Sequence, residues 1–296
     1  MSVTIYIVLI NVFNLYGGEF IGFPFDILTI IFIIFFLPLF YLFIYREKHR
    51  ITIGNGKNNS VEFEQNKELP LKYDIYRKLT HFVVLGIMFF YFTLGLILQN
   101  FLITIGEDIM IFSQKLVVFL VMISLIGLLT ADLVRILTPQ LYPLKPVNQL
   151  LREKELHMRL GPHISMSIGC FSIILLYGIF QPIGPVILCT SMTMSIFGDV
   201  AANLIGRTIG HKRIRKTNKT YEGLIGGVFA AFISGFIVLY ILRNYYRFNI
   251  LGLLLIPFFG MVIIGILDFL DLEVDDNLTF NFCVSTILFY TSISLL

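Results

Sequence analysis

Long apolar runs, each of about 18 residues or more, recur along almost the whole of this 296-residue chain. A run of this length can cross a hydrocarbon core about 30 Å thick. In lipid, every backbone N–H and C=O must find its partner within the chain, so such runs become helices. A membrane β-barrel needs strands that alternate with a period of two, whereas these runs are continuously apolar. We therefore predict an all-α, polytopic transmembrane helical bundle.

The expected number of membrane spans is eight or nine. Charged residues make up only 14% of the chain, against about 25% in soluble domains, and they avoid the apolar runs. The segment 1–16 is short, and we interpret it as a span, an interfacial helix or a tilted helix. The expected spans are 1–16, 22–45, 79–99, 115–137, 163–180, 183–206, 222–242, 250–268 and 278–296.

The connections between these spans alternate in charge, which predicts their orientation. Loops 46–78, 138–162 and 207–221 hold most of the Lys and Arg residues. Basic loops face the cytoplasm, and by parity the acidic loop 269–277 faces it too. Within the first loop, the Asn- and Gly-rich stretch 51–68 is typical of a linker. We therefore divide the chain into 1–72, an N-terminal span or spans with a polar cytoplasmic linker, and 73–296, a membrane-embedded domain.

Asp199 is the acid that stands out within the apolar runs. An ionisable residue inside a membrane span is costly and usually functional. Asn203 follows Asp199 by four residues and can share its helix face. The alternative is a structural ion pair with a partner on another helix. The three cysteines, Cys170, Cys189 and Cys283, lack metal-ligand spacing, and we interpret them as membrane-buried thiols.

A glycine-rich and basic stretch follows Asp199 and leads into the next span. Glycines allow a backbone to approach a phosphate closely, lysines supply positive charge, and a helix N-terminus adds free N–H groups and a positive dipole. The stretch predicts a polyphosphate cradle; the alternatives are positive-inside charge and contact with anionic lipids. Its candidate residues are Gly198, Gly206, Gly210, Lys212, Lys216, Lys219, Thr220, Glu222 and Gly223.

An acidic cluster precedes the last span. Hard carboxylate oxygens suit Mg²⁺, which usually takes one or two of them together with phosphate oxygens. The cluster therefore suggests Mg²⁺ ligands beside the basic loop, with a solvated acidic turn as the alternative. Its members are Asp268, Asp271, Glu273, Asp275 and Asp276.

Three shorter motifs stand earlier in the chain, two at the cytoplasmic ends of spans and one in the loop 138–162. His81 follows Arg77 by four residues and Lys78 by three, so the three can share one helix face. Positive-inside anchoring would explain them equally. The pairs Asp132 with Arg135, and Arg152 with Glu155, have the spacing of simple ion pairs on a helix. His157 and His163 lack a metal-ligand context, and we interpret them as interfacial.

Taken in order, these motifs resemble the CTP-dependent lipid-alcohol kinases: dolichol or polyprenol kinase, phytol kinase and the CTP-dependent diacylglycerol kinase of fungi. The resemblance extends from about residue 74 to residue 285. The matching pieces are Arg77-Lys78-x-x-His81, Asp132-x-x-Arg135, Arg152-x-x-Glu155 with Gly161, the stretch from Gly198-Asp199 to Lys219-Thr220-x-Glu222-Gly223, and Asp275-Asp276-Asn277.

The resemblance implies that 73–296 is a kinase domain that moves the γ-phosphoryl group of CTP to a lipid alcohol, most simply a polyprenol. CTP, the lipid alcohol and the bilayer are then the partners, Mg²⁺ is the cofactor, and no nucleic acid is expected. Asp199, His81, Lys78, Arg77 and Asp276 are the candidate catalytic residues, and Asp199, Glu222, Asp275 and Asp276 the candidate metal ligands. The glycine-rich and basic stretch, with Asn203, Arg135, Arg152 and Glu155, is expected to bind the nucleotide.

Three other functions stay open at this point. The run Lys219-Thr220-Tyr221-Glu222-Gly223-Leu224-Ile225-Gly226-Gly227 also resembles phosphatidate cytidylyltransferase, although the usual C-terminal signature of that family is missing after residue 227. A transporter of an anionic solute would predict internal repeats, and the sequence shows none. A structural scaffold would not need Asp199. For the kinase, we expect a multi-pass protein with its site on the cytoplasmic side, in the endoplasmic reticulum of a eukaryote or the plasma membrane of a prokaryote.

Overall fold

The computed structural model describes most of the chain from residue 24 onwards. The described residues are 24–53, 71–102, 109–142, 151, 161–178, 180, 183–214, 217, 219–243, 248–272 and 276–295. The expected first span, 1–16, and most of the expected linker, 51–68, lie outside them. The boundary between residues 72 and 73 therefore stays a prediction.

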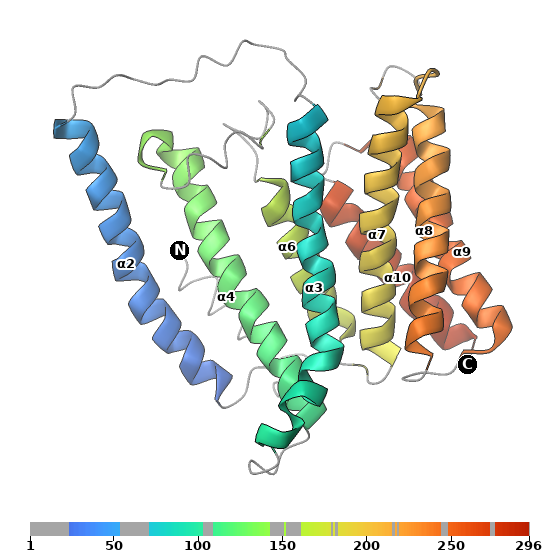
Figure 1. Ribbon diagram of the computed structural model, residues 1–296, viewed down its shortest axis with the longest axis horizontal. Helices are drawn as coiled ribbons and strands as arrows, with labels where there is room; N and C mark the ends of the chain where they lie inside the picture. The colour runs from blue at the N-terminus through green and yellow to red at the C-terminus, as the bar shows by residue number, and fades with distance from the viewer. Residues whose placement is uncertain are drawn as a thin grey trace. The chain divides into compact units, whose positions relative to one another are not determined.

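The described residues form helices, together with one isolated antiparallel bridge between Arg213 and Thr220. Figure 1 shows them in chain order. They are α2 (Phe25–Ile53), α3 (Leu71–Leu102), α4 (Ile109–Leu137), the short 3₁₀ helix η1 (Pro139–Leu141), α6 (Pro162–Tyr177), α7 (Ile183–Thr208), α8 (Tyr221–Leu242), α9 (Ile250–Leu270) and α10 (Asp276–Ser294).

Within the described residues, each expected span from 22–45 onwards falls mainly in a helix, which agrees with an all-α membrane protein. Among the described residues, five helices are long and apolar enough to cross a bilayer: the segments Phe25–Thr52, Phe112–Leu137, Ile183–Thr208, Tyr221–Leu242 and Ile250–Leu270. Several helices extend beyond their expected spans, most clearly α2 to Ile53, α3 back to Leu71 and α4 back to Ile109. The reason is that hydropathy marks only the apolar part of a helix, whereas backbone hydrogen bonding continues into the polar turns beside it.

The chain divides into two compact units. One unit takes residues 1–80 and 89–164, and the other takes 81–88 and 165–296. Within the first unit, α2 and α4 run in the same direction, because Phe25 contacts the rings of Phe112 and Phe119 at 5.3 and 5.6 Å, while Gly127 faces Phe36 further along both helices. Aromatic side chains therefore join these two helices.

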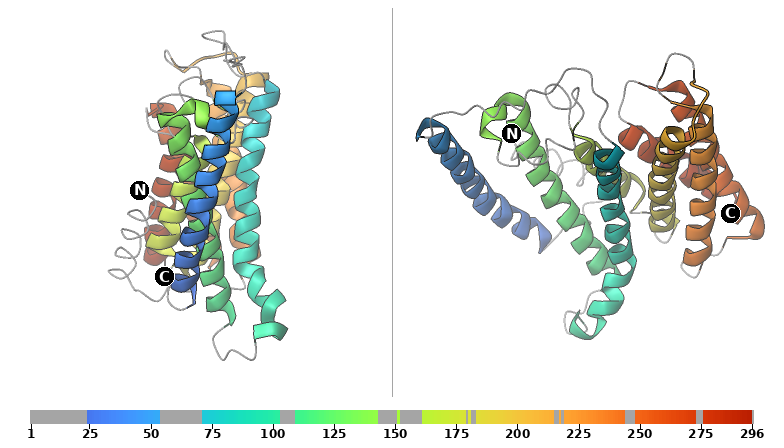
Figure 2. Two further views of the ribbon diagram at one scale, coloured as in Figure 1. Left: turned by 90° about the vertical axis from the view of Figure 1, so that its left-hand side faces the viewer. Right: turned by 45° about the horizontal axis from the view of Figure 1, so that its top comes forward.

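In the second unit, α7 and α8 pack through small residues spaced four apart. Gly198, Ala202 and Gly206 on α7 face Gly223, Gly227 and Ala231 on α8. A Cβ added at Gly227 would lie 2.7 Å from the Ala202 Cβ and 2.8 Å from the Gly198 carbonyl oxygen. Small residues at this spacing let two membrane helices approach closely. The α7–α8 pair is therefore closely packed, and the two helices lie side by side in both figures (Figures 1 and 2).

Helices α9 and α10 complete the second unit. Met194 of α7 is fully buried, and a Cβ added at Gly260 of α9 would meet its Sδ and Cε and the Leu288 side chain of α10. Tyr177 at the end of α6 joins α10 through a 2.7 Å hydrogen bond to the Thr286 hydroxyl. The cysteines were predicted to be buried thiols. Cys170 and Cys189 are buried, as predicted, while Cys283 is half-buried.

Candidate functional site

The basic loop between α7 and α8 is a compact turn braced by its own backbone. Ile214 N–H donates to the Lys219 carbonyl at 2.8 Å, and Tyr221 N–H donates to the Lys212 carbonyl at 2.9 Å. The Lys212 N–H donates to both carboxylate oxygens of Glu222 at 3.3 Å. Ile214 is buried beneath the turn, while Lys212 and Arg213 are exposed. The two described ends of the loop are therefore held together, with Lys212 and Arg213 exposed beside them.

Thr220 begins α8 as its N-cap residue. Its hydroxyl oxygen accepts a hydrogen bond from the Gly223 N–H at 3.2 Å, which satisfies a donor that would otherwise be left without a partner in the first turn. Gly210 must approach Thr220 closely, because a Cβ at residue 210 would lie 2.5 Å from the Thr220 hydroxyl and would also meet the Gly206 carbonyl. Glycines here bring the end of α7 against the start of α8.

The Lys219 ammonium contacts three carboxylates that lie about fifty residues later in the sequence. Its Nζ lies 2.9 Å from Asp268 Oδ1, 3.0 Å from Asp271 Oδ1 and 3.1 Å from Asp276 Oδ2. Asp268 stands in the last turn of α9, Asp271 is its C-cap and Asp276 opens α10. We call Lys219, Asp268, Asp271 and Asp276 the lysine–aspartate cluster. It ties the start of α8 to the junction of α9 and α10.

Asp271 takes a backbone conformation that suits its place in this cluster. Its φ is +47°, in the left-handed region, which Asp adopts more readily than most residues. Its N–H donates to the Leu267 carbonyl at 3.3 Å and ends α9. The chain then turns at the end of the helix, and the Asp271 carboxylate meets Lys219.

The charges within the cluster act on one another. Burial disfavours the ammonium of Lys219, but the negative charges of Asp276 and Asp268 outweigh burial and raise its pKa. Burial is also the main reason that the pKa of Asp276 is raised to about 6; Lys219 opposes this shift, and the charge of Asp199 adds to it. Lys219 therefore stays protonated, and Asp199 lies near enough to Asp276 to influence it.

His81 and Asp199 meet beside this cluster. His81 Nδ1 lies 3.7 Å from Asp199 Oδ2, and the His81 side chain is buried. The distance exceeds that of a hydrogen bond but allows charge pairing when the imidazole is protonated. Phe82 packs edge-on against Phe197 at 5.6 Å and fixes this part of α3 on α7. The intramembrane acid predicted from the sequence therefore has a histidine next to it.

Within the described lysine–aspartate cluster, carboxylates outnumber cations. When ionised, its three aspartates carry three negative charges against the one positive charge of Lys219. Among the residues that the structure describes, no three His, Cys, Asp or Glu side chains are grouped so as to hold a metal ion by themselves.

A different charged cluster lies in the first unit. Arg135 donates from Nε to Asp132 Oδ1 at 2.6 Å and from Nη2 to Asp132 Oδ2 at 3.0 Å. The Gly161 N–H donates to Asp132 Oδ2 at 3.0 Å. Burial, and then the charge of Asp132, raise the pKa of the nearby Tyr142. Both charged side chains are 1% exposed, so this is a buried, bidentate pair on one helix.

The structure brings together part of the predicted site. Asp199, His81, Lys219 and Asp276 belong to one group, and Asn203 follows Asp199 by one turn of α7. Arg77 and Lys78 are buried and precede His81 by about one turn of α3. Arg152, Glu155, Lys216 and Asp275 lie outside the described residues.

Two sets of contacts were not predicted from the sequence. Asp268 and Asp271 contact Lys219 as closely as Asp276 does, yet only their membership of an acidic cluster could be read from the sequence. Gly198, Gly206 and Gly223 were predicted to approach a phosphate, and the structure places them in the contact between α7 and α8. Their four-residue spacing is the signal that could have revealed this contact.

Comparison with known proteins adds no relative to this description. No protein-family model matches the chain, and no curated protein and no solved structure matches it either.

Proposed function

We propose that this protein is a membrane-embedded, CTP-dependent kinase that transfers the γ-phosphoryl group to the hydroxyl of a membrane lipid alcohol, with a polyprenol such as dolichol as the acceptor. The supporting observation is the convergence of motifs that are far apart in sequence. Lys219, His81, Asp199 and Asp276 come from four separate stretches, and each has at least one of the others within reach.

The charge of the site favours a neutral acceptor. Phosphatidate, the lipid used by the rival cytidylyltransferase reaction, is anionic, and the carboxylate excess around Lys219 would repel its phosphate. An alcohol hydroxyl is uncharged and can donate a hydrogen bond to a carboxylate. The same excess rules out tight binding of a bare triphosphate, so the nucleotide must arrive with cations.

The carboxylate oxygens fit Mg²⁺ as an ion shared with the nucleotide. Asp199, Asp268 and Asp276 offer hard oxygen ligands, and Mg²⁺ commonly takes one or two carboxylates together with phosphate oxygens. When bound, Mg²⁺ would neutralise charge that develops on the transferred phosphoryl group. Glu222, also a predicted metal ligand, accepts hydrogen bonds from the Lys212 N–H with both carboxylate oxygens and keeps lone pairs that can meet a cation.

Phosphoryl transfer depends mainly on positioning and electrostatic stabilisation. Lys219 remains protonated and supplies positive charge close to the reacting phosphate, while the dipole of α8 adds to it from Thr220 onwards. Asp199 Oδ2 accepts the proton of the lipid hydroxyl, and His81 stabilises the charge on that carboxylate until the proton has moved. The hydroxyl oxygen forms the new P–O bond, and CDP leaves.

The proposal includes the number of membrane spans, their orientation and the cellular membrane. The chain has eight or nine spans, its basic loops face the cytoplasm, and CTP reaches the site from that side. The location is the endoplasmic reticulum in a eukaryote and the plasma membrane in a prokaryote. Arg77 and Lys78 stabilise the transferred group from the turn before His81.

Labelled CTP distinguishes the candidate reactions. Purified protein is incubated with Mg²⁺, a panel of polyprenol, phytol, diacylglycerol and phosphatidate, and CTP labelled at either the α- or the γ-phosphate. We expect γ-label in an alcohol together with release of CDP. Transfer of α-label to phosphatidate with release of pyrophosphate would show a cytidylyltransferase. If neither label enters any lipid, the protein is not an enzyme of either kind.

A further inference from the structure

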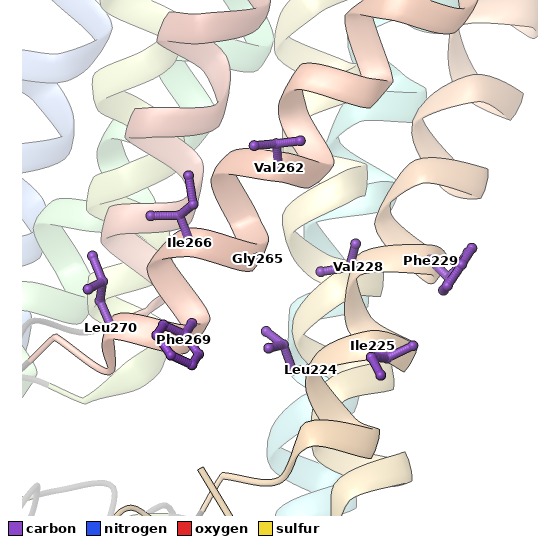
Figure 3. A pocket seen from close by; sticks show the side chains of 9 residues that line it. All are labelled: Leu224, Ile225, Val228, Phe229, Val262, Gly265, Ile266, Phe269 and Leu270. Atoms are coloured by element: carbon purple, nitrogen blue, oxygen red, sulfur yellow. The ribbon is translucent and has the colours of Figure 1, made fainter. Parts of the chain in front are cut away.

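An apolar groove runs between α8 and α9 and ends at the lysine–aspartate cluster. Its volume is about 420 Å³, within the range of roughly 300–1,000 Å³ that small-molecule sites occupy. Figure 3 shows the residues that line it, and all of them are apolar. They come from the first two turns of α8, beginning at Leu224, and from the last turns of α9, from Val262 to Leu270. Along α9 this covers about 12 Å.

The groove has exposed rims and a narrow centre. Ile225 and Phe229 form the rim on α8 and are 56% and 61% exposed, while Ile266 and Leu270 form the rim on α9. Leu224 and Val228 point across towards α9 (Figure 3). At the centre, a Cβ added at Gly265 would lie 3.1 Å from Val228 Cγ2. The groove is therefore open along one side, between the exposed apolar side chains of the two helices.

The polar end of the groove is defined by the helix termini that bound it. Lys219 stands just before α8 and Asp271 directly follows α9, and the two form an ion pair at 3.0 Å. This pair crosses from one wall of the groove to the other, beyond Leu224 and Leu270. A molecule lying along the groove with a polar end towards the termini would present that end to the lysine–aspartate cluster.

We propose that this groove holds the hydrocarbon chain of a membrane alcohol, with the hydroxyl at the lysine–aspartate cluster. The occupant is an isoprenoid-type alcohol and not an anionic phospholipid, because the described polar end has three carboxylates and one lysine and would repel an anionic headgroup. The inference rests on the proposed function for the identity of the acceptor, and it adds the place and direction in which that acceptor binds.

Tryptophan fluorescence tests the groove directly, because the chain contains no Trp. Phe229→Trp places a single reporter on the groove rim. Phe258→Trp is the matched control, since Phe258 is an exposed phenylalanine of α9 that does not line the groove. A brominated isoprenoid alcohol is titrated into nanodiscs of neutral phospholipid without CTP. We expect saturable quenching at residue 229 that unlabelled polyprenol reverses, and only weak, non-saturable quenching at residue 258.

A blocking substitution supplies the second readout. Gly265→Leu in the Phe229→Trp background fills the centre of the groove and should remove the saturable quenching. With active protein it should raise the KM for the lipid alcohol about tenfold, equivalent to about 1.4 kcal/mol, and leave the KM for CTP unchanged. Gly86→Leu on α3 is the control, because a Cβ there would meet no described atom within 4 Å.

The outcomes separate this inference from the proposed function. Equal quenching at residues 229 and 258, or quenching that polyprenol does not reverse, would mean that ordinary bilayer lipid covers the groove and would overturn the inference, even if γ-label moves from CTP to an alcohol. Reversible quenching at residue 229 without any transfer of label would keep the groove and overturn the kinase. If Gly265→Leu does not fold, the two single-Trp proteins still decide between these outcomes.

Discussion

The two charged clusters of this protein are built on opposite principles. In the first unit, Asp132 and Arg135 form a one-to-one, bidentate pair that is almost wholly buried. In the second unit, Lys219 faces three carboxylates, and its side chain is 24% exposed while that of Asp271 is 39% exposed. The first cluster is electrically balanced and closed, and the second is unbalanced and accessible.

The difference indicates what each cluster is for. A buried pair with matched donors and acceptors leaves little capacity for a ligand, and breaking it is costly because the remaining charge has no counter-ion. An accessible cluster with excess negative charge retains the capacity to bind a cation and whatever the cation carries. We therefore predict that Asp132 and Arg135 contribute mainly to stability, although Arg135 was also expected to bind the nucleotide, and we propose that the lysine–aspartate cluster serves the function.

The largest expected effect is on stability. Asp132→Asn leaves the buried Arg135 charge without its carboxylate, and we expect a loss of about 3–5 kcal/mol in the free energy of unfolding, measured as a lower Tm and lower yield in detergent. Activity per folded molecule should change only a few-fold. The double variant Asp132→Leu/Arg135→Met should recover stability, since neither charge remains. If Asp132→Asn instead keeps the Tm of the unmodified protein but no longer binds CTP, Arg135 belongs to the nucleotide site, as the sequence motif predicts.

Lys219→Met should show the reverse pattern. Removal of the ammonium takes away the positive charge near the reacting phosphate, and we expect kcat to fall about 10²–10³-fold, the usual cost of losing one electrostatic contact to a transition state. The Tm should fall less than in Asp132→Asn, because the Lys219 side chain is 24% exposed, whereas those of Asp132 and Arg135 are each 1% exposed. Lys219→Arg, which keeps the charge, is the control and should recover part of the activity. A large fall in Tm with unchanged kcat would make the cluster a structural brace.

Gly227→Ala should have the smallest effect of the three substitutions. It tests whether close packing of α7 and α8 stabilises the second unit. The added Cβ would collide with Ala202 and the Gly198 carbonyl, so we expect a loss of about 1–3 kcal/mol through overpacking. Gly86→Ala, on open helix surface, should be neutral or slightly stabilising. Thermal unfolding in the same detergent measures both. Equal Tm values for the two variants would show that α7 and α8 are not held by close packing.

Much of the fold could be predicted because the membrane imposes it. The expected spans 183–206, 222–242 and 250–268 agree closely with α7, α8 and α9. In lipid, a single apolar run can satisfy all of its backbone hydrogen bonds internally only as a helix. The position of Asp199 within a span was predictable for the same reason. The candidate site was predictable only as a set of motifs on the expected cytoplasmic side, without their contacts.

The sequence by itself determined which segments are helices, where their charges stand and which acid lies inside a span, because hydropathy and spacing are properties of one segment at a time. Only the tertiary structure decided which helix ends meet. Contact between α7 and α8 through glycines, and the reach of Lys219 to Asp268 and Asp271, depend on the rotation and register of whole helices. Side-chain packing between segments sets both, and no single segment contains that information.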